Sequence, residues 1–115
     1  MSDRMRRVDE AVREVLGESV QHLKDPRIGF VTVTDVDTSA DLSQARVYVS
    51  LLGNPEERQA SVDGLNSAAG LLQRRVAMQL RMKRTPTLTF LEDPTARRAA
   101  RVDEILASEP EAPPS

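Results

Sequence analysis

The stretch from Pro55 to Arg84 constrains the fold of this chain most strongly, because it reads as one helical segment too long for a small domain. Its apolar residues recur at three- and four-residue spacing on both sides of Ala68-Ala69-Gly70. Unbroken, this helix would run ~45 Å at 1.5 Å per residue, whereas a compact chain of 115 residues has a diameter of ~35 Å. We therefore expect two helices joined by a bend at Gly70, since glycine weakens a helix interior.

The residues before this segment predict a helix and a β-hairpin. Asp3 to His22 carries an apolar stripe at helical spacing, and Pro26 stops the helix because proline cannot donate a backbone hydrogen bond. Phe30 to Val36 and Ala45 to Leu52 each alternate apolar and polar residues, with turn residues between them, which is typical of an antiparallel hairpin with one apolar face. In the loop that follows, Asn54 is expected to cap the long helical segment.

The residues after the segment complete the expected domain. Thr87 to Phe90 alternates as a third strand, and Asp93 is expected to cap a short helix that runs through Ala107. Residues 108–115 form a short acidic, proline-rich tail for which we expect disorder. The order helix, strand, strand, kinked helix pair, strand predicts an α+β domain over residues 1–107, with the helices on one face of a three-stranded sheet.

The composition argues against several classes of protein. The chain has no cysteine, which excludes disulfides and thiolate metal sites, and no apolar run near the ~20 residues that cross a bilayer. The single histidine, His22, is expected at a helix end, and Asp35 and Asp37 share a face without a third metal ligand. No glycine-rich phosphate loop or serine nucleophile motif occurs. We therefore expect a cytoplasmic protein without catalytic activity, metal or cofactor, and without membrane contact.

Although the net charge is −2, the distribution of the charged residues along the chain favours an anionic partner. Four of the 18 acidic residues follow Arg101, so the body is mildly basic, and 14 of the 16 cations are arginine, whose planar guanidinium suits phosphate. Since aromatic residues are only 3% of the chain, any RNA contact should use backbone phosphates rather than base stacking. The candidate contacts on the second helix of the pair and on the first helix are Arg74, Arg75, Arg81, Lys83, Arg84, Arg6 and Arg7.

A second stripe on the same helix allows a different function. Leu71, Met78 and Met82 lie away from its core-facing residues and are bordered by arginines. This stripe is either a further contact with the core or an exposed surface where a partner protein docks. The sequence leaves both interpretations open.

Several segments, taken in order and spacing, resemble the bacterial ribosome-binding factor A family. They are the run from Asp25 to Val36, the run from Asp41 to Ser50, Ala68-Ala69-Gly70, Leu80-Arg81-Met82-Lys83, and Pro86-Thr87-Leu88-Thr89-Phe90 followed by Asp93. The resemblance covers nearly the whole chain except its last ten or so residues.

The resemblance implies a KH-like fold of the type II order. It also implies a monomeric, non-catalytic assembly factor that binds the small ribosomal subunit and its rRNA during late maturation, notably in the cold, with ribosomal proteins or other assembly factors as further partners. KH domains grip nucleic acid with a Gly-x-x-Gly loop, which this chain lacks. The family instead has a kink, here Ala68-Ala69-Gly70, as a candidate RNA contact together with Arg27. One departure is Gln73, where relatives are expected to carry arginine.

Overall fold

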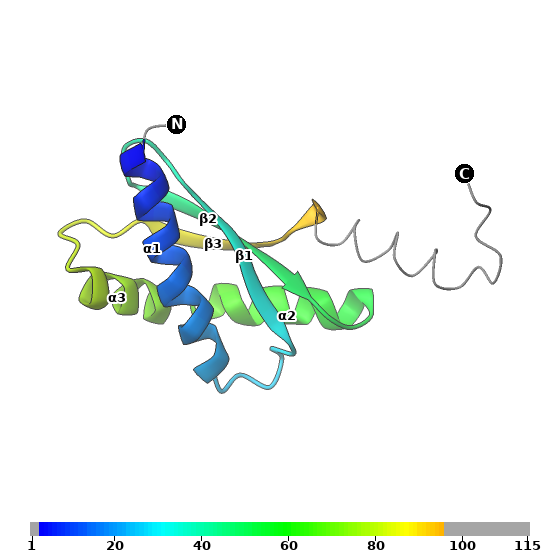
Figure 1. The fold of residues 1–115 in the computed structure, drawn as a ribbon. Coiled ribbons are helices and arrows are strands. Elements are labelled where there is room, and N and C mark those ends of the chain that lie inside the picture. The colour runs from blue at the N-terminus through cyan, green and yellow to red at the C-terminus, as the bar shows by residue number, and fades with distance from the viewer. Residues whose placement is uncertain (1–2, 96–115) are drawn as a thin grey trace, which may run out of the picture.

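The structure, a computed structural model, describes residues 3–95 and confirms the expected α+β fold (Figure 1). Its elements are α1 (Asp3–Ser19), a short 3-10 turn η1 (Val20–His22), β1 (Val31–Thr38), β2 (Gln44–Leu51), α2 (Pro55–Ser67), α3 (Ala69–Leu80) and β3 (Thr87–Glu92). Asn54 caps α2 as expected, since its side chain accepts a hydrogen bond from the N–H of Glu57. The expected helix through Ala107, the domain boundary there and the tail lie outside the described residues.

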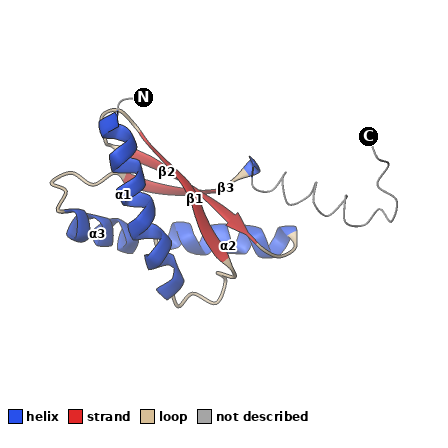
Figure 2. Cartoon of the chain, viewed as in Figure 1, coloured by secondary structure: helices blue, strands red, loops and turns tan. Residues whose placement is uncertain are grey.

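The sheet has the order β1-β2-β3, in which β1 and β2 are antiparallel and β2 and β3 are parallel. Figure 2 shows α1 passing across these strands. Val33 pairs with Val49, but Asp35 pairs with Tyr48, so Thr34 is the extra residue of a β-bulge. Without the bulge, strict alternation would turn Asp35 rather than Val36 toward the core. One face of the sheet is therefore buried along its length, and the other stays open to solvent.

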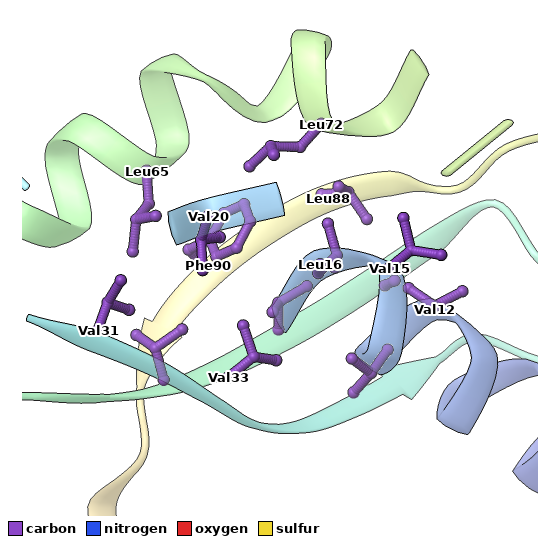
Figure 3. Packing of buried hydrophobic residues seen from close by; sticks show 14 of the residues in the cluster. Val12, Val15, Leu16, Val20, Val31, Val33, Leu65, Leu72, Leu88 and Phe90 are labelled. Atoms are coloured by element: carbon purple, nitrogen blue, oxygen red, sulfur yellow. The ribbon is translucent and has the colours of Figure 1, made fainter. Parts of the chain in front are cut away.

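A single hydrophobic core fills the space between the buried sheet face and the helices. Figure 3 shows Leu65 and Leu72 pointing from the two helices α2 and α3 toward the strands, where Phe90 lies, with Leu16 of α1 beside them. Burying each of these side chains stabilises the fold by about 1.5–3 kcal/mol. Because both halves of the long helical segment contribute to one core, α2 and α3 are held against the same face of the sheet.

Helix side chains bind the backbone of β1, an edge strand. Gln21 Nε2 donates to the carbonyl oxygen of Val31 at 3.0 Å, and Asp9 Oδ1 accepts from the N–H of Thr38 at 3.1 Å. An exposed strand edge otherwise presents free N–H and C=O groups that another chain can pair with. Both ends of β1 are therefore occupied from within the molecule.

The other edge strand, β3, is bound by one side chain of α2. Asn66 Nδ2 donates to the carbonyl oxygen of Phe90 at 3.1 Å, and Asn66 Oδ1 accepts from the N–H of the same residue at 2.8 Å. The amide thus takes the place of a neighbouring strand. It also fixes the last turn of α2 against the middle of β3.

We predict that Asn66→Ala lowers the free energy of unfolding by about 1–3 kcal/mol, because it leaves the N–H and C=O of Phe90 without their amide partner. Gln79→Ala, which removes an exposed amide from the neighbouring helix, is the control and should change it by less than about 0.5 kcal/mol. Urea unfolding of both variants measures the difference. Equal stabilities would show that the Asn66 bonds contribute nothing.

The turn between β1 and β2 is organised by one carboxylate. Asp41 Oδ1 accepts from the hydroxyl of Ser43 at 2.7 Å, the hydroxyl of Ser39 at 2.8 Å and the N–H of Ser43 at 3.1 Å. These hydrogen bonds, that of the Ser43 hydroxyl foremost, lower the pKa of Asp41 from 3.8 to about 2. The folded state therefore favours the ionised carboxylate.

This pKa difference predicts a pH-dependent effect of Asp41→Asn. The folded-state pKa lies below the unfolded-state value, so the carboxylate stabilises the fold fully above the latter and loses this effect as the pH falls through about 2. The Tm of the variant should be below that of the wild type at neutral pH, and the gap should close between about pH 4 and pH 2. A gap for Asp41→Asn that stays constant over this range would contradict the account.

Candidate nucleic-acid interface

The break in the long helical segment is confirmed, but its expected pivot at Gly70 is wrong. The residue between the two helices is Ala68, whose φ of −89° and ψ of 1° lie outside the helical range. Its N–H bonds to the carbonyl oxygens of Gly64 and Leu65, and its own carbonyl accepts from Leu72. Any L-residue can adopt these dihedrals, so no glycine is needed at the pivot, and Gly70 lies inside α3 with φ outside the left-handed region.

The first turn of α3 combines open space with hydrogen-bond donors. The first N–H groups of a helix have no carbonyl partner in that helix and form the positive end of its dipole. Gly70 is exposed, and a Cβ added to it would meet no atom within 4 Å. This corner is therefore accessible to an anion such as a phosphate.

The structure brings five of the predicted cations together on α3 and the turn after it. α3 packs along β3. It is held there at both ends, because Asn66 just before α3 binds Phe90 in the middle of the strand, and the turn after α3 leads directly into the strand at Thr87. Figure 1 shows the loop that leads from α3 back into β3. All five side chains are exposed, namely Arg74, Arg75, Arg81, Lys83 and Arg84.

The turn that carries the last three cations is held in place. Arg81 ends α3 in the left-handed conformation, with φ of 51°, and the N–H of Met82 bonds to the carbonyl oxygen of Ala77 at 3.2 Å. Gln73 Nε2 donates to the carbonyl oxygen of Thr85 at 3.1 Å. Gln73 thus fastens α3 to the segment that leads into β3.

Arg27 lies beside the break but already has an anionic partner. Its guanidinium donates to both carboxylate oxygens of Asp25, with Nη2 2.7 Å from Oδ2, and also to Ser67 Oγ at 3.2 Å. The hydrogen bond from Arg27 lowers the pKa of the Asp25 carboxyl. Sequence reasoning missed this pair, which the two-residue spacing of Asp25 and Arg27 across a proline turn would have indicated.

Arg6 and Arg7 are exposed on α1. They lie in the first turns of α1, and Arg6 lines a groove between α1 and β1 together with Asp35 and Asp37. The acidic residues of this groove make it less suited to phosphate than the surface of α3 is.

The second stripe on α3 is partly exposed and partly core. Leu71 and Met78 are 44% and 78% exposed, whereas Met82 packs against the core. The core interpretation is therefore correct for Met82 and wrong for the other two.

Within residues 3–95, no group of three or more His, Cys, Asp or Glu side chains is placed to hold a metal ion. No helix in this part of the chain is long and apolar enough to cross a membrane.

Comparison with known proteins gives a consistent match. The sequence profile described as ribosome-binding factor A matches residues 4–106. A ribosome-binding factor A from Rubrobacter xylanophilus is 47% identical over 110 residues, which are 92% of this chain and 88% of that protein. The crystal structure of ribosome-binding factor A from Thermus thermophilus matches with a TM-score of 0.69 at 31% identity, over 76% of this chain and 94% of that one.

A further structural match comes from an assembly. A homology-built ribosome-binding factor A of Thermus thermophilus, fitted into an electron cryomicroscopy map of its complex with the 30S subunit, matches with a TM-score of 0.65. It is 31% identical, and the match covers 76% of this chain and 92% of that one.

The left-handed conformation of Arg81 predicts opposite effects of two glycine substitutions on stability. Arg81→Gly should leave the free energy of unfolding unchanged or raise it by up to about 1 kcal/mol, because glycine adopts positive φ without steric cost. Arg74→Gly, in the middle of α3, should lower it by about 1 kcal/mol. Denaturant unfolding compares them. A clear loss of stability in Arg81→Gly would contradict the assigned backbone geometry.

Proposed function

The chain belongs to the ribosome-binding factor A family, and from this premise we propose that it is an assembly factor that binds the small ribosomal subunit and its rRNA during late maturation. The relative from Thermus thermophilus in complex with the 30S subunit supports the small subunit as the partner. In this proposal the protein acts as a monomer in the cytoplasm, and it contributes binding rather than catalysis.

The observation that carries the proposal is the group of exposed cations on α3 and in the turn after it. The surface begins at Gly70, in the open first turn of the helix, and ends in the turn after Arg81. A helix of 12 residues is ~18 Å long at 1.5 Å per residue, which is long enough to follow several nucleotides. RNA phosphates would accept hydrogen bonds from N–H groups at one end and from guanidinium groups along the rest.

We propose that this surface reads the RNA backbone and its shape rather than base identity. The helix carries no aromatic side chain on which a base would stack. Arg27 has a supporting role beside the break, because its guanidinium is already bound to Asp25 and Ser67. The hydrogen bonds of Met82 and Gln73 on either side of Lys83 and Arg84 hold this turn beside the end of α3, which lowers the entropy lost when its cations bind RNA.

Binding to immature small subunits should weaken with salt and with reversal of the α3 charges. Each phosphate that the protein no longer neutralises reduces the slope of log K against log[salt] by about 0.7–0.9. The triple variant Arg74→Glu, Arg81→Glu, Arg84→Glu should therefore bind much more weakly, with a slope reduced by about 2, whereas Arg13→Glu on α1 should have a small effect. Co-sedimentation at several salt concentrations measures both quantities. Salt-independent binding, or full binding by the triple variant, would refute the RNA surface.

The exposure of Met78 favours one second candidate, a protein partner that docks on α3. Exposed apolar side chains at helical spacing are typical of such surfaces. The same experiment separates the two functions. If Met78→Asp abolishes binding while the triple charge variant retains it, the stripe with Leu71 is the docking site and the RNA surface is refuted.

A further inference from the structure

Two large apolar side chains are exposed at one end of the open sheet face. Phe30 is 78% exposed and Leu52 is 68% exposed, and the N–H of Leu52 bonds to the carbonyl oxygen of Phe30 at 3.4 Å. The next pair along the hairpin, Val31 and Leu51, is buried in the core. Since side chains alternate along strands, Phe30 and Leu52 lie on the face opposite the helices, beside each other.

The backbone on both sides of this apolar pair is fixed. The N–H of Gly29 donates to Ser61 Oγ at 3.0 Å, which ties the chain before Phe30 to α2. After Leu52, the carbonyl oxygen of Gly53 accepts from Arg58 Nη1 at 2.7 Å. The pair is thus presented on ordered backbone, and its exposure is a property of the folded hairpin.

Most of the charged side chains on the rest of the open face are acidic. Asp35 and Asp37 are exposed on β1, and Asp37 pairs in register with Arg46, the cation that β2 contributes to this face. Beside the turn between β1 and β2, at the other end of the hairpin from Phe30 and Leu52, a groove of about 660 Å³ is lined by Asp37, Asp41, Arg46 and Leu91, among others. The charge of this face is therefore opposite to that of α3.

We propose that the open face of the sheet docks a basic segment of a partner protein. Phe30 and Leu52 form the apolar anchor of this site, and the carboxylates of Asp35 and Asp37 receive lysine or arginine side chains. From the apolar pair to Asp37 the surface extends over about seven strand residues, or ~23 Å at 3.3 Å per residue. A short extended peptide has this length. RNA fits the face poorly because its phosphates would be repelled by these carboxylates.

Because this docking site rests on the proposed function, it is tested with two probes, purified small ribosomal subunits and the same rRNA freed of protein. Phe30→Ser with Leu52→Ser should lower affinity for subunits at least tenfold and leave affinity for protein-free rRNA unchanged. Asp35→Lys with Asp37→Lys should have the same pattern. Because all four side chains are exposed, the Tm of each variant should stay within a few degrees of that of the wild type.

The other outcomes each overturn the proposal. If the variants bind subunits as tightly as the wild type does, the open face has no partner on the subunit. If the wild type itself does not bind subunits, the proposed function is refuted together with the docking site. An equal loss on protein-free rRNA would make the face an RNA contact. A photo-reactive phenylalanine analogue at position 30 gives a second, direct check. Cross-links to a subunit protein support the proposal, and cross-links to rRNA or to nothing refute it.

Discussion

The two hydrogen bonds between the Asn66 side chain and the backbone of Phe90 fix the end of α2 against β3, on the face of the sheet where the hydrophobic core holds α2 and α3. They hold the last turn of α2 at the middle of β3, so the break at Ala68 and the start of α3 follow at a fixed position. The same bonds satisfy the outer edge of β3 and prevent it from pairing with another chain. The cationic surface of α3 depends on this placement, because its direction along β3 is set there.

The one-sided burial of the sheet divides the surface of the molecule. The helices cover one face and carry most of the exposed arginines of the described residues, while the open face carries acidic residues and the apolar pair Phe30 and Leu52. α3 carries Arg74 and Arg75 and no acidic residue, so a polyanion such as RNA would be attracted to α3 and repelled by the aspartates of the open face. A family member in this orientation would present its open sheet face to whatever lies beside the RNA.

The sequence was sufficient to predict the order of the elements, because hydrophobic periodicity and capping residues determine them locally. It was insufficient where a contact joins residues far apart. Asn66 looks like a surface residue of a helix until β3 lies beside it. Gly70 was the obvious pivot by composition, but Ala68 bends without a positive φ. Met82 belongs to the core and Met78 does not, because the left-handed Arg81 ends the helix between them and redirects the chain.

The central claim, that α3 faces rRNA and the open sheet face does not, is tested by directed cleavage of the RNA. The chain has no cysteine, so a single cysteine introduced at Gln79 on α3 or at Thr89 on the open face carries a tethered radical-generating reagent at one known place. On immature small subunits, the account predicts strong, localised rRNA cleavage from position 79 and little from position 89. Strong cleavage from position 89 with none from position 79 would contradict it.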